Sequence, residues 1–384
     1  MSPKRIKIIQ SAEKVFSKKG ATAATISEIA KKAGVSDAII YQHFKGKEDL
    51  LHSIPYERLQ ELINRAEEAL QGINHIESCL RKLFWCHLSF FAQHKELAKI
   101  LILQCRPSDH FYTTPAYEVL QKYESIIAGI LQNGVREGIF REDIPMSFVQ
   151  DAIIGMLDFE TLGIAVTGET ADPMANIDDM IAMIHAMISK STVSVQQIST
   201  EDKILIAAEK VFDAKGFLKA TMSEIASAAG VAEGTVYDYF ANKDQLMISI
   251  PKKRIERYYT KVEELFHATR PATKLERYIQ FIFSFFLKDY EISKVFYQIL
   301  LSQQFYASDG YKSFQHHFGV IEDIVTEGVK TGDFRPNANA RLFRNMFMGI
   351  CTRFAISWFI LEQPADKIKQ VNMMTELLIS SIST

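Results

Sequence analysis

Apolar residues recur along most of the chain at intervals of three and four, the spacing that places them on one face of an α-helix. One such stretch is Leu80, Leu83, Phe84, Leu88 and Phe91. No sustained alternation of apolar and polar residues, the pattern of a half-buried strand, interrupts these runs. The pattern therefore predicts an all-α protein.

The helical pattern occurs twice. Residues 12–55 match residues 208–251 at a constant offset of 196, with 23 identities in 44 positions. Further along, Gly155-Met156 stands opposite Gly349-Ile350 at an offset of 194, as expected if the same helices are joined by slightly different loops. Because an internal repeat defines the architecture of a chain, we expect two tandem copies of one helical unit.

The repeat divides the chain into five segments. We expect each copy to begin with a shorter segment, called here the head, at 1–54 and 201–250. Each head should be followed by a longer segment, called the body, at 55–190 and 251–384, and a linker at 191–200 should join the two copies. The linker is rich in polar residues and spans up to about 35 Å when extended, which is enough to connect neighbouring subunits.

Each head contains the start and stop signals of short helices. In the first head an amphipathic stretch at 4–19 ends at Gly20, a suitable C-terminal cap. Thr25 and Glu28 have the spacing of a capping box, in which the threonine hydroxyl accepts from the Glu28 amide and the carboxylate accepts from the Thr25 amide. The second head repeats these residues at the same offset.

The capped helix is followed by Ala33-Gly34-Val35, where glycine permits the positive φ of a tight turn. A short helix over 36–44 comes next, and another begins near Lys47. Three short helices with a glycine-centred turn predict a helix-turn-helix, whose second element lies in the major groove of DNA. A plain helical bundle, in which the turn is only a corner, is disfavoured because the whole set recurs with its caps.

Both heads resemble the DNA-binding segment of TetR/AcrR-family transcriptional regulators, over about 45 residues of each half. In the first head the resemblance lies in Thr25-(x)₃-Ile29-Ala30-(x)₂-Ala33-Gly34-Val35-Ser36-(x)₄-Tyr41-(x)-His43-Phe44-(x)₂-Lys47-(x)₂-Leu50. In the second it lies in Thr221, Ile225-Ala226, Ala229-Gly230-Val231, Gly234-Thr235, Tyr237, Tyr239-Phe240, Lys243 and Leu246. The resemblance implies that each half is similar to one subunit of an all-helical dimer with a DNA-binding head and a ligand-binding body.

The resemblance also implies which head residues contact DNA. The residues expected to bind backbone phosphates have hydroxyl, imidazole or ammonium donors: Thr25, Tyr41, His43, Lys47, Thr221, Tyr237, Tyr239 and Lys243. The residues expected to face the bases lie on the short third helix of each head: Ser36, Asp37, Ala38, Ile39, Gln42, Ala232, Glu233, Gly234, Thr235 and Asp238. Neither helix contains arginine or lysine, so neither offers the bidentate contact to guanine.

Charge is distributed unequally between the two heads. Residues 1–60 contain 11 basic and 6 acidic side chains, a net charge of +5, whereas residues 201–260 contain 9 of each. The rest of the chain therefore holds −7 of the total of −2. Attraction to DNA should come mainly from the first head, and we expect a pseudo-palindromic operator with unlike half-sites.

The bodies are rich in aromatic residues, which at helical spacing either form the core or line a site for an apolar or aromatic effector. The candidate ligand contacts are Phe84, Phe91, Gln104, Phe111, Tyr117, Phe281, Phe285, Tyr297, Gln303 and Phe305. With such an effector the chain is expected to be a ligand-responsive regulator, and we expect a repressor, although nothing in the sequence specifies repression or activation.

The last two helices of each half match the elements that pair subunits in the family. They are expected near 146–166, 177–189, 337–361 and 366–382. Gly155 and Gly349 would allow two of them to approach closely. Fusion in one chain therefore predicts a monomeric pseudo-dimer, with recognition helices about 34–36 Å apart on double-stranded DNA, and leaves a homodimer open.

A proline stands early in the fourth helix of each copy, at Pro55 and Pro251. Proline removes a helical hydrogen bond and bends the helix there. It is either a hinge that connects ligand binding to the head or a packing feature inherited through the duplication.

Several classes of protein are excluded. With 47% hydrophobic residues the chain is not expected to be disordered. Four cysteines at unrelated spacings predict reduced, packed thiols. The sequence contains no apolar run of membrane-spanning length and no signal-peptide pattern, so we expect a cytoplasmic protein without a membrane partner. It also contains no phosphate loop, catalytic elbow or histidine pair at metal spacing, so we expect no enzyme, cofactor or metal.

A competing hypothesis belongs to a different class. The chain could be a helical module that binds a ligand or a protein and in which one or both heads have lost DNA binding. The neutral second head and the absence of cations from both recognition helices support this alternative.

Overall fold

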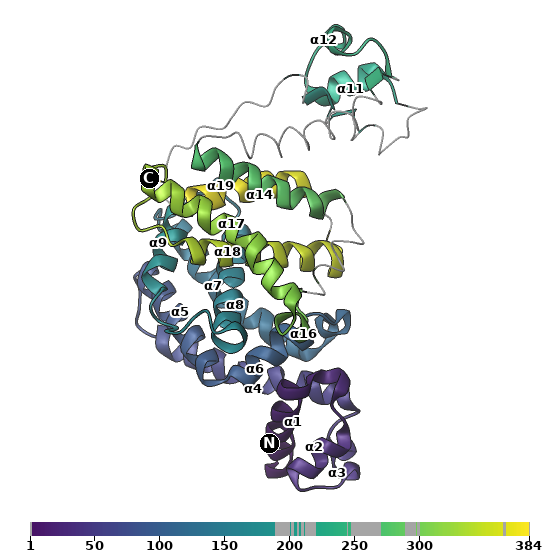
Figure 1. Cartoon of the computed structure of the whole chain (residues 1–384), viewed down its shortest axis with the longest axis vertical. Coiled ribbons are helices and arrows are strands. Elements are labelled where there is room, and N and C mark those ends of the chain that lie inside the picture. Colours follow the sequence, from purple (N-terminus) through teal and green to yellow (C-terminus); the bar gives the residue numbers. More distant parts are fainter. Residues whose placement is uncertain are drawn as a thin grey trace. The chain divides into compact units, whose positions relative to one another are not determined.

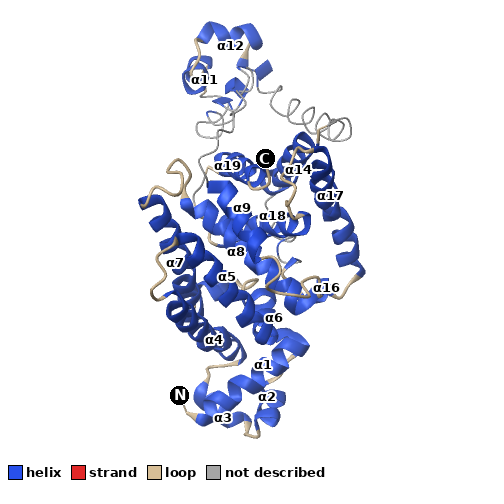
Figure 2. Ribbon diagram, turned by 90° about the vertical axis from the view of Figure 1, so that its left-hand side faces the viewer, coloured by secondary structure: helices blue, strands red, loops and turns tan. Residues whose placement is uncertain are grey.

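The computed structural model describes residues 2–188, 220–243, 270–288, 300–363 and 366–383, together with positions 200, 203–205, 207–208, 211, 245–246 and 297. Within these ranges the chain consists of helices and loops and has no strand, apart from one isolated bridge between Phe334 and Ser383 (Figure 2). The all-α prediction is confirmed.

The first head consists of α1 (Pro3–Ala23), α2 (Ile26–Ala33), α3 (Asp37–His43) and the beginning of α4 (Lys47–Leu70). Gly20 interrupts α1 with a φ of 79°, a conformation that glycine adopts without the steric cost of a Cβ. The helix predicted to end at Gly20 therefore does change direction there. The helix α1 packs against both α2 and α4, and α2 in turn contacts α3 (Figure 1).

The first body continues from α4, which runs through Pro55 as one helix. The other elements are α5 (Ile76–Gln93), α6 (Lys95–Ile100), the π-helical η1 (Leu101–Cys105), the 3-10 segment η2 (Asp109–Thr113), α7 (Pro115–Arg136), α8 (Met146–Leu162), the π-helical η3 (Gly163–Thr167) and α9 (Ile177–Ile188). Apolar faces of α4, α5, α7 and α8 meet in its core.

The described part of the second body repeats this order. Its elements are α14 (Pro271–Lys288), α16 (Gln303–Tyr306), α17 (Asp309–Thr331), α18 (Ala340–Ala355), the π-helical η4 (Ile356–Ile360) and α19 (Lys367–Ser380). Local details recur as well. The Arg141 amide donates to the carbonyl of Ile188 at 3.0 Å, and the Arg335 amide donates to that of Ile382 at 2.9 Å. The two bodies are therefore copies in structure as well as in sequence.

The second head belongs to a separate compact unit, residues 192–269, and its described helices are α11 (Met222–Ala229) and α12 (Glu233–Tyr239). Its core is formed by buried apolar side chains: Ile204, Leu205, Ala207, Ala208, Ala220, Met222, Ile225, Ala226, Val236, Phe240 and Leu246. Pro251 and almost all of the predicted linker lie outside the described residues.

The two bodies pair with each other through α8 and α18 (Figure 1). A Cβ added to Gly155 would lie 2.5 Å from the carbonyl carbon of Gly349, and one added to Gly349 would lie 2.1 Å from that of Gly155. The helix backbones thus touch where glycine leaves room. The close approach predicted from these two glycines is confirmed, and α9 also contacts α19.

All four cysteines are buried with free thiols, as expected for packed residues. Among the described helices, none combines the length and the apolar character needed to cross a membrane.

Candidate DNA-binding heads and effector cavity

The recognition helix of the first head presents nearly all of its predicted contact residues outward. In α3, Ile40 alone is buried and anchors the helix to the head. Ser36, Asp37, Ala38, Tyr41 and Gln42 are exposed, and Ile39 and His43 are half-buried. Tyr41 is 58% exposed, so its side chain is not packed in the core.

The turn before α3 has the predicted geometry. The amide of Glu28 donates to the hydroxyl of Thr25 and the amide of Thr25 donates to the carboxylate of Glu28, both at 3.2 Å. Gly34 ends α2 with a φ of 68°. These local bonds satisfy the amides at the start of α2 and keep Thr25 exposed on the same head as α3.

A lysine and an arginine side chain bind the backbone on either side of the helix-turn-helix. The ammonium of Lys47 donates to the carbonyls of Ala24 at 3.1 Å and Thr22 at 3.3 Å, next to Thr25. Arg5 lies 4.5 Å above the ring of Phe44 and donates to the carbonyl of His43 at 3.1 Å. Lys47 thus positions the loop that presents Thr25, and Arg5 fixes the end of α3. Sequence reasoning did not single out Arg5.

The second head repeats this geometry. Thr221 and Glu224 form a capping box at 3.1 and 3.2 Å, and the ammonium of Lys243 donates to the carbonyl of Ala220 at 2.8 Å. In α12, Val236 alone is buried. The predicted contact residues are exposed or, for Thr235, half-buried: Ala232, Glu233, Gly234, Thr235, Tyr237, Asp238 and Tyr239.

The first body encloses a small cavity of about 20 Å³, enough for roughly one water molecule. Its lining is apolar except for a cluster of polar side chains. His87 lies 3.0 Å from the Tyr123 hydroxyl through Nδ1 and 3.1 Å from the Thr161 hydroxyl through Nε2. Burial lowers the pKa of His87 to about 3, so its imidazole is neutral at physiological pH.

A buried ion pair completes the polar side of the cavity. Arg106 and Asp158, 3% and 6% exposed, are hydrogen-bonded through Nη1 and Oδ2. Burial raises the pKa of Asp158, and the positive charge of Arg106 opposes that effect. Nε of Arg106 is buried without a hydrogen-bond partner. A donor left unpaired beside a cavity is suited to an acceptor group of a ligand.

The second body contributes a cation to this region. Arg353 of α18 donates to the carboxylate of Glu124 at 2.9 and 3.2 Å and to that of Asp151 at 2.9 Å. Glu124 itself lines the cavity. The polar side of the first body's cavity is therefore held in place partly from the other half of the chain.

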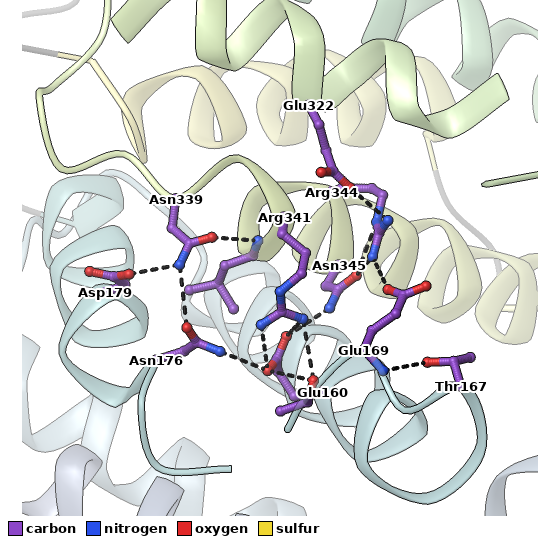
Figure 3. Close-up of polar contacts among 12 residues, drawn as sticks. Glu160, Thr167, Glu169, Asn176, Asp179, Glu322, Asn339, Arg341, Arg344 and Asn345 are labelled. Atoms are coloured by element: carbon purple, nitrogen blue, oxygen red, sulfur yellow. Dashed lines mark hydrogen bonds and ion pairs between the residues drawn. The ribbon is translucent and has the colours of Figure 1, made fainter. Parts of the chain in front are cut away.

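A second polar network joins the bodies around Glu160, which is fully buried (Figure 3). Arg341 donates to its two carboxylate oxygens at 2.9 and 3.1 Å, and Asn345 donates to Oε1 at 2.7 Å. Thr170 and Asn176 donate from the first body, each at 3.2 Å. The buried carboxylate is thus paired by two residues of α18 and two of the first body.

Comparison with known proteins agrees with this geometry. The family model described as "Bacterial regulatory proteins, tetR family" matches residues 8–54 and again 204–250. A second model, "YsiA-like protein, C-terminal region", matches residues 56–191 and 252–381. The chain belongs to the TetR family of bacterial regulatory proteins. It consists of two TetR units fused in tandem. Its function is that of a DNA-binding transcriptional regulator.

Individual relatives each match about half of this TetR-family chain. The fatty acid metabolism regulator protein of Bacillus subtilis (strain 168) is 33% identical over 156 residues, which cover 41% of this chain and 80% of the relative. The transcriptional repressor NicS of Pseudomonas putida is 28% identical, over 45% of this chain and 85% of its own length. The crystal structure of FadR from Bacillus subtilis in complex with stearoyl-CoA is 28% identical with a TM-score of 0.44, covering 47% of this chain and 96% of that one.

Of the ligand contacts predicted for this TetR fusion, Phe91 lines the first body's cavity. Phe84 is fully buried in the core, and Phe111 packs against Tyr117 with ring centroids 5.9 Å apart. Tyr297 is buried, with its hydroxyl 3.5 Å from that of Tyr112. The others of this group lie in the second body: Phe281 is half-buried, Phe305 packs among aromatic rings, and the side chain of Phe285 lies outside the described part.

The two predicted glutamine contacts attach the first head to the bodies instead of lining the first body's cavity. Nε2 of Gln104 donates to the carbonyl of Phe16 at 2.9 Å, and Nε2 of Gln303 donates to that of Ser17 at 3.1 Å. Both carbonyls belong to α1. One glutamine from each body thus binds the same helix of the first head.

A second cavity of about 30 Å³, again roughly the size of one water molecule, lies where α17 and α18 meet the end of α8. It is lined by aromatic residues and by the Arg344–Glu169 ion pair.

Sequence reasoning missed His87 and Asp158, two of the polar residues that line the first cavity. The usable signal was their chemistry: a histidine inside the apolar stripe from Leu83 to Phe91 must find partners when buried.

Proposed function

We propose that the chain is an effector-released transcriptional repressor that acts as a single-chain pseudo-dimer on an operator with unlike half-sites. The observation that carries this proposal is the presence of two helix-turn-helix pairs, α2–α3 and α11–α12, on a chain whose two bodies pair with each other. A homodimeric regulator offers the same head twice, whereas this chain offers two different ones.

The heads differ in their expected share of DNA binding. The first has the surplus of positive charge, and its exposed Gln42 is suited to the N6 and N7 atoms of adenine. In the second, Asp238 takes the place of Gln42, and a carboxylate can accept only from a base amino group such as that of cytosine. The half-sites are therefore expected to differ in sequence, and the first to contribute more affinity.

The contacts between the bodies favour pairing of the first with the second. In the repeat, Glu160 corresponds to Phe354, Arg341 to Ser147 and Asn345 to Asp151. If two first bodies paired, Glu160 would face a serine and an aspartate instead of Arg341 and Asn345. A buried carboxylate without a cation costs about 3–5 kcal/mol. The chain is thus expected to be monomeric, and light scattering should return about the chain's own mass of 43.7 kDa.

The effector is proposed to enter the first body. The cavity there combines apolar walls with an unpaired Arg106 donor and the neutral His87. An apolar chain that ends in an acidic or carbonyl group would fit this lining once the cavity widens. A relative that regulates fatty acid metabolism supports the same chemistry, so the proposed effector is a long-chain fatty acid or its acyl thioester.

A continuous set of contacts connects this cavity to the head. The hydroxyl of Tyr112, in η2, donates to the carbonyl of Arg106 at 3.0 Å. The neighbouring Phe111 packs on His52 of α4, with ring centroids 5.7 Å apart. A ligand that displaces Arg106 would therefore move η2 and, through it, the end of α4 that belongs to the first head.

The test is a gel shift of the full chain on the DNA upstream of its own gene, over a salt series and with a long-chain fatty acid or acyl-CoA added. Specific binding with a steep negative salt slope, released by the acyl ligand, is expected. The double variant Arg106→Leu/Asp158→Thr, which introduces the uncharged residues of the second body, should bind DNA and no longer respond.

Absence of specific binding even at low salt would instead support the non-DNA-binding module. Release of the double variant by the ligand at the wild-type concentration would remove the first cavity from the mechanism. The variants Gln42→Ala and Asp238→Ala distinguish the contributions of the two heads to DNA recognition. Each should relax sequence specificity in one half-site, and the two losses should be unequal.

A further inference from the structure

Two histidines and a glutamate that are distant in the sequence meet where the first head joins the first body. Glu48 and His52 lie one turn apart on α4, and His110 comes from η2. One potential ligand atom from each residue lies within 4.8 Å of the other two. The rings of His52 and His110 have centroids 5.7 Å apart.

His52 has an unsatisfied polar atom at this place. The side chain is 5% exposed, and its Nε2 is buried without a hydrogen-bond partner. A buried ring nitrogen that has lost its hydrogen bond to water and gained no other partner is unfavourable, so it calls for an explanation in a well-packed protein. A bound cation would supply the missing partner.

The other two residues complete a set of ligands. The hydroxyl of Thr113 lies 3.1 Å from Nδ1 of His110 and orients that ring, which leaves Nε2 to bind a metal ion. Glu48 offers an exposed carboxylate. Imidazole nitrogens with one carboxylate are typical ligands of Zn²⁺ and related transition metals, whereas Mg²⁺ and Ca²⁺ prefer oxygen ligands alone.

We propose that Glu48, His52 and His110 bind one divalent transition-metal ion, of the Zn²⁺ class, that ties the first head to the first body. Ligand bonds of about 2.0–2.2 Å would bring the three ligand atoms to roughly 3.3 Å from one another. Since they now lie within 4.8 Å, side-chain movements of about an ångström or two suffice. Three protein ligands leave one position for water.

The second copy does not have this set. In the repeat, Asp244 corresponds to Glu48, Ile248 to His52 and Gln304 to His110. An isoleucine cannot bind a metal ion, so the proposal predicts one site per chain. The proposal also departs from the expectation of no metal that was drawn from the sequence. The sequence pattern did not indicate this site, because His110 lies far from Glu48 and His52 along the chain.

The experiment uses the full chain without an affinity tag. Titration with Co²⁺, followed by its visible d–d absorption, and with Zn²⁺, followed by calorimetry, should give one ion per chain. Zn²⁺ should also raise the unfolding temperature, since an ion that binds only the folded state stabilises it.

The variant His110→Gln, which introduces the residue of the second copy at an exposed position, should lower metal affinity by at least about tenfold and abolish the thermal shift. The matched control is His75→Gln, a histidine at the start of α5 outside the cluster, which should bind the metal like the wild type.

Glu48→Gln supplies a second, exposed ligand removal that does not disturb the core, and should also weaken binding. Undiminished binding by both His110→Gln and Glu48→Gln, or an equal loss in His75→Gln, would overturn the proposal. None of these measurements involves DNA or an acyl ligand, so their outcome is independent of the proposed repressor function.

Discussion

The two bodies have the same helices but different interiors. The first surrounds its cavity with His87, Arg106, Asp158 and Thr161. The corresponding residues of the second body are uncharged and buried: Ile282, Leu300, Thr352 and Ala355. The same helical order thus accommodates either a charged or an apolar interior.

The features that both bodies share are the ones that the fold needs. Burial of apolar faces and close packing are common to both bodies, whereas the ion pair is confined to one. A buried ion pair is a weak source of stability, because removing two charges from water offsets most of their attraction. Its presence in the first body is therefore better explained by the proposed effector site than by folding.

The largest effect is expected from breaking the Arg106–Asp158 pair on one side only. Arg106→Leu leaves a buried aspartate without its cation and should lower the free energy of unfolding by about 3–5 kcal/mol. Arg106→Leu/Asp158→Thr, which copies the second body, should recover most of that loss. Urea denaturation of the wild type and both variants gives the comparison. Equal destabilisation of the single and double variants would show that the first body cannot tolerate the interior of the second.

A smaller effect is expected at the contact between the bodies. Glu160→Gln keeps the shape of the side chain but removes the charge that pairs with Arg341, and should cost about 2–3 kcal/mol. The matched control is Glu67→Gln, whose carboxylate lies 3.9 Å from Lys122 on the surface, and it should cost about 0–1 kcal/mol. Unfolding curves that do not separate these two variants would contradict the importance assigned to the buried network.

Substitutions at the crossing of α8 and α18 should lower the stability less than the loss of the Glu160 charge. Gly155→Ala places a methyl group against the backbone of α18, so the helices must separate, at a cost of about 1–3 kcal/mol. Gly129→Ala in α7 meets no atom within 4 Å and should be neutral or stabilising by up to about 1 kcal/mol. Thermal unfolding of the two variants checks the prediction, and a stabilised Gly155→Ala would rule out the direct backbone contact.

The smallest effect concerns pH. Burial holds the pKa of His87 at about 3, below the ordinary value of 6.5, so acid favours the unfolded chain. The stability this histidine contributes is complete above about pH 6.5 and is lost as the pH falls, by about 1 kcal/mol between pH 7.5 and 5.5. The variant His87→Ile, which introduces the residue found at Ile282, should therefore lose about 1 kcal/mol less free energy of unfolding than the wild type over the same pH interval, as measured by urea denaturation. An identical pH dependence in both proteins would mean that burial does not lower the pKa of His87, as for a histidine in contact with water.

Local features of the heads were predictable because neighbouring residues determine them. The Thr25–Glu28 capping box and the turn at Gly34 depend on hydrogen bonds between residues three to five apart. The exposure of Tyr41 follows from the period of a short helix anchored by Ile40. The pairing of α8 with α18 was predictable from two glycines, because the repeat indicated which helices would meet.

The proposed effector site was not predictable in the same way. Aromatic residues at helical spacing are present in both bodies, and nothing in their spacing separates Phe91, which lines a cavity, from Phe84, which fills the core. The polar residues of that cavity come from four parts of the first body: α5, the end of η1, α7 and α8. Gln104 and Gln303 have the chemistry of ligand contacts, yet they bind the backbone of α1.

By itself the sequence determined the all-α fold, its duplication, the two heads and the unequal charge between them. Periodicity, caps and repeats are properties of neighbouring residues, so they can be recognised before folding. Only the folded structure shows that Arg106 contacts Asp158, that Glu160 contacts Arg341 and that His52 lies beside His110. These partners are 52, 181 and 58 positions apart in the chain, and only the packing of whole helices brings such residues within reach of one another.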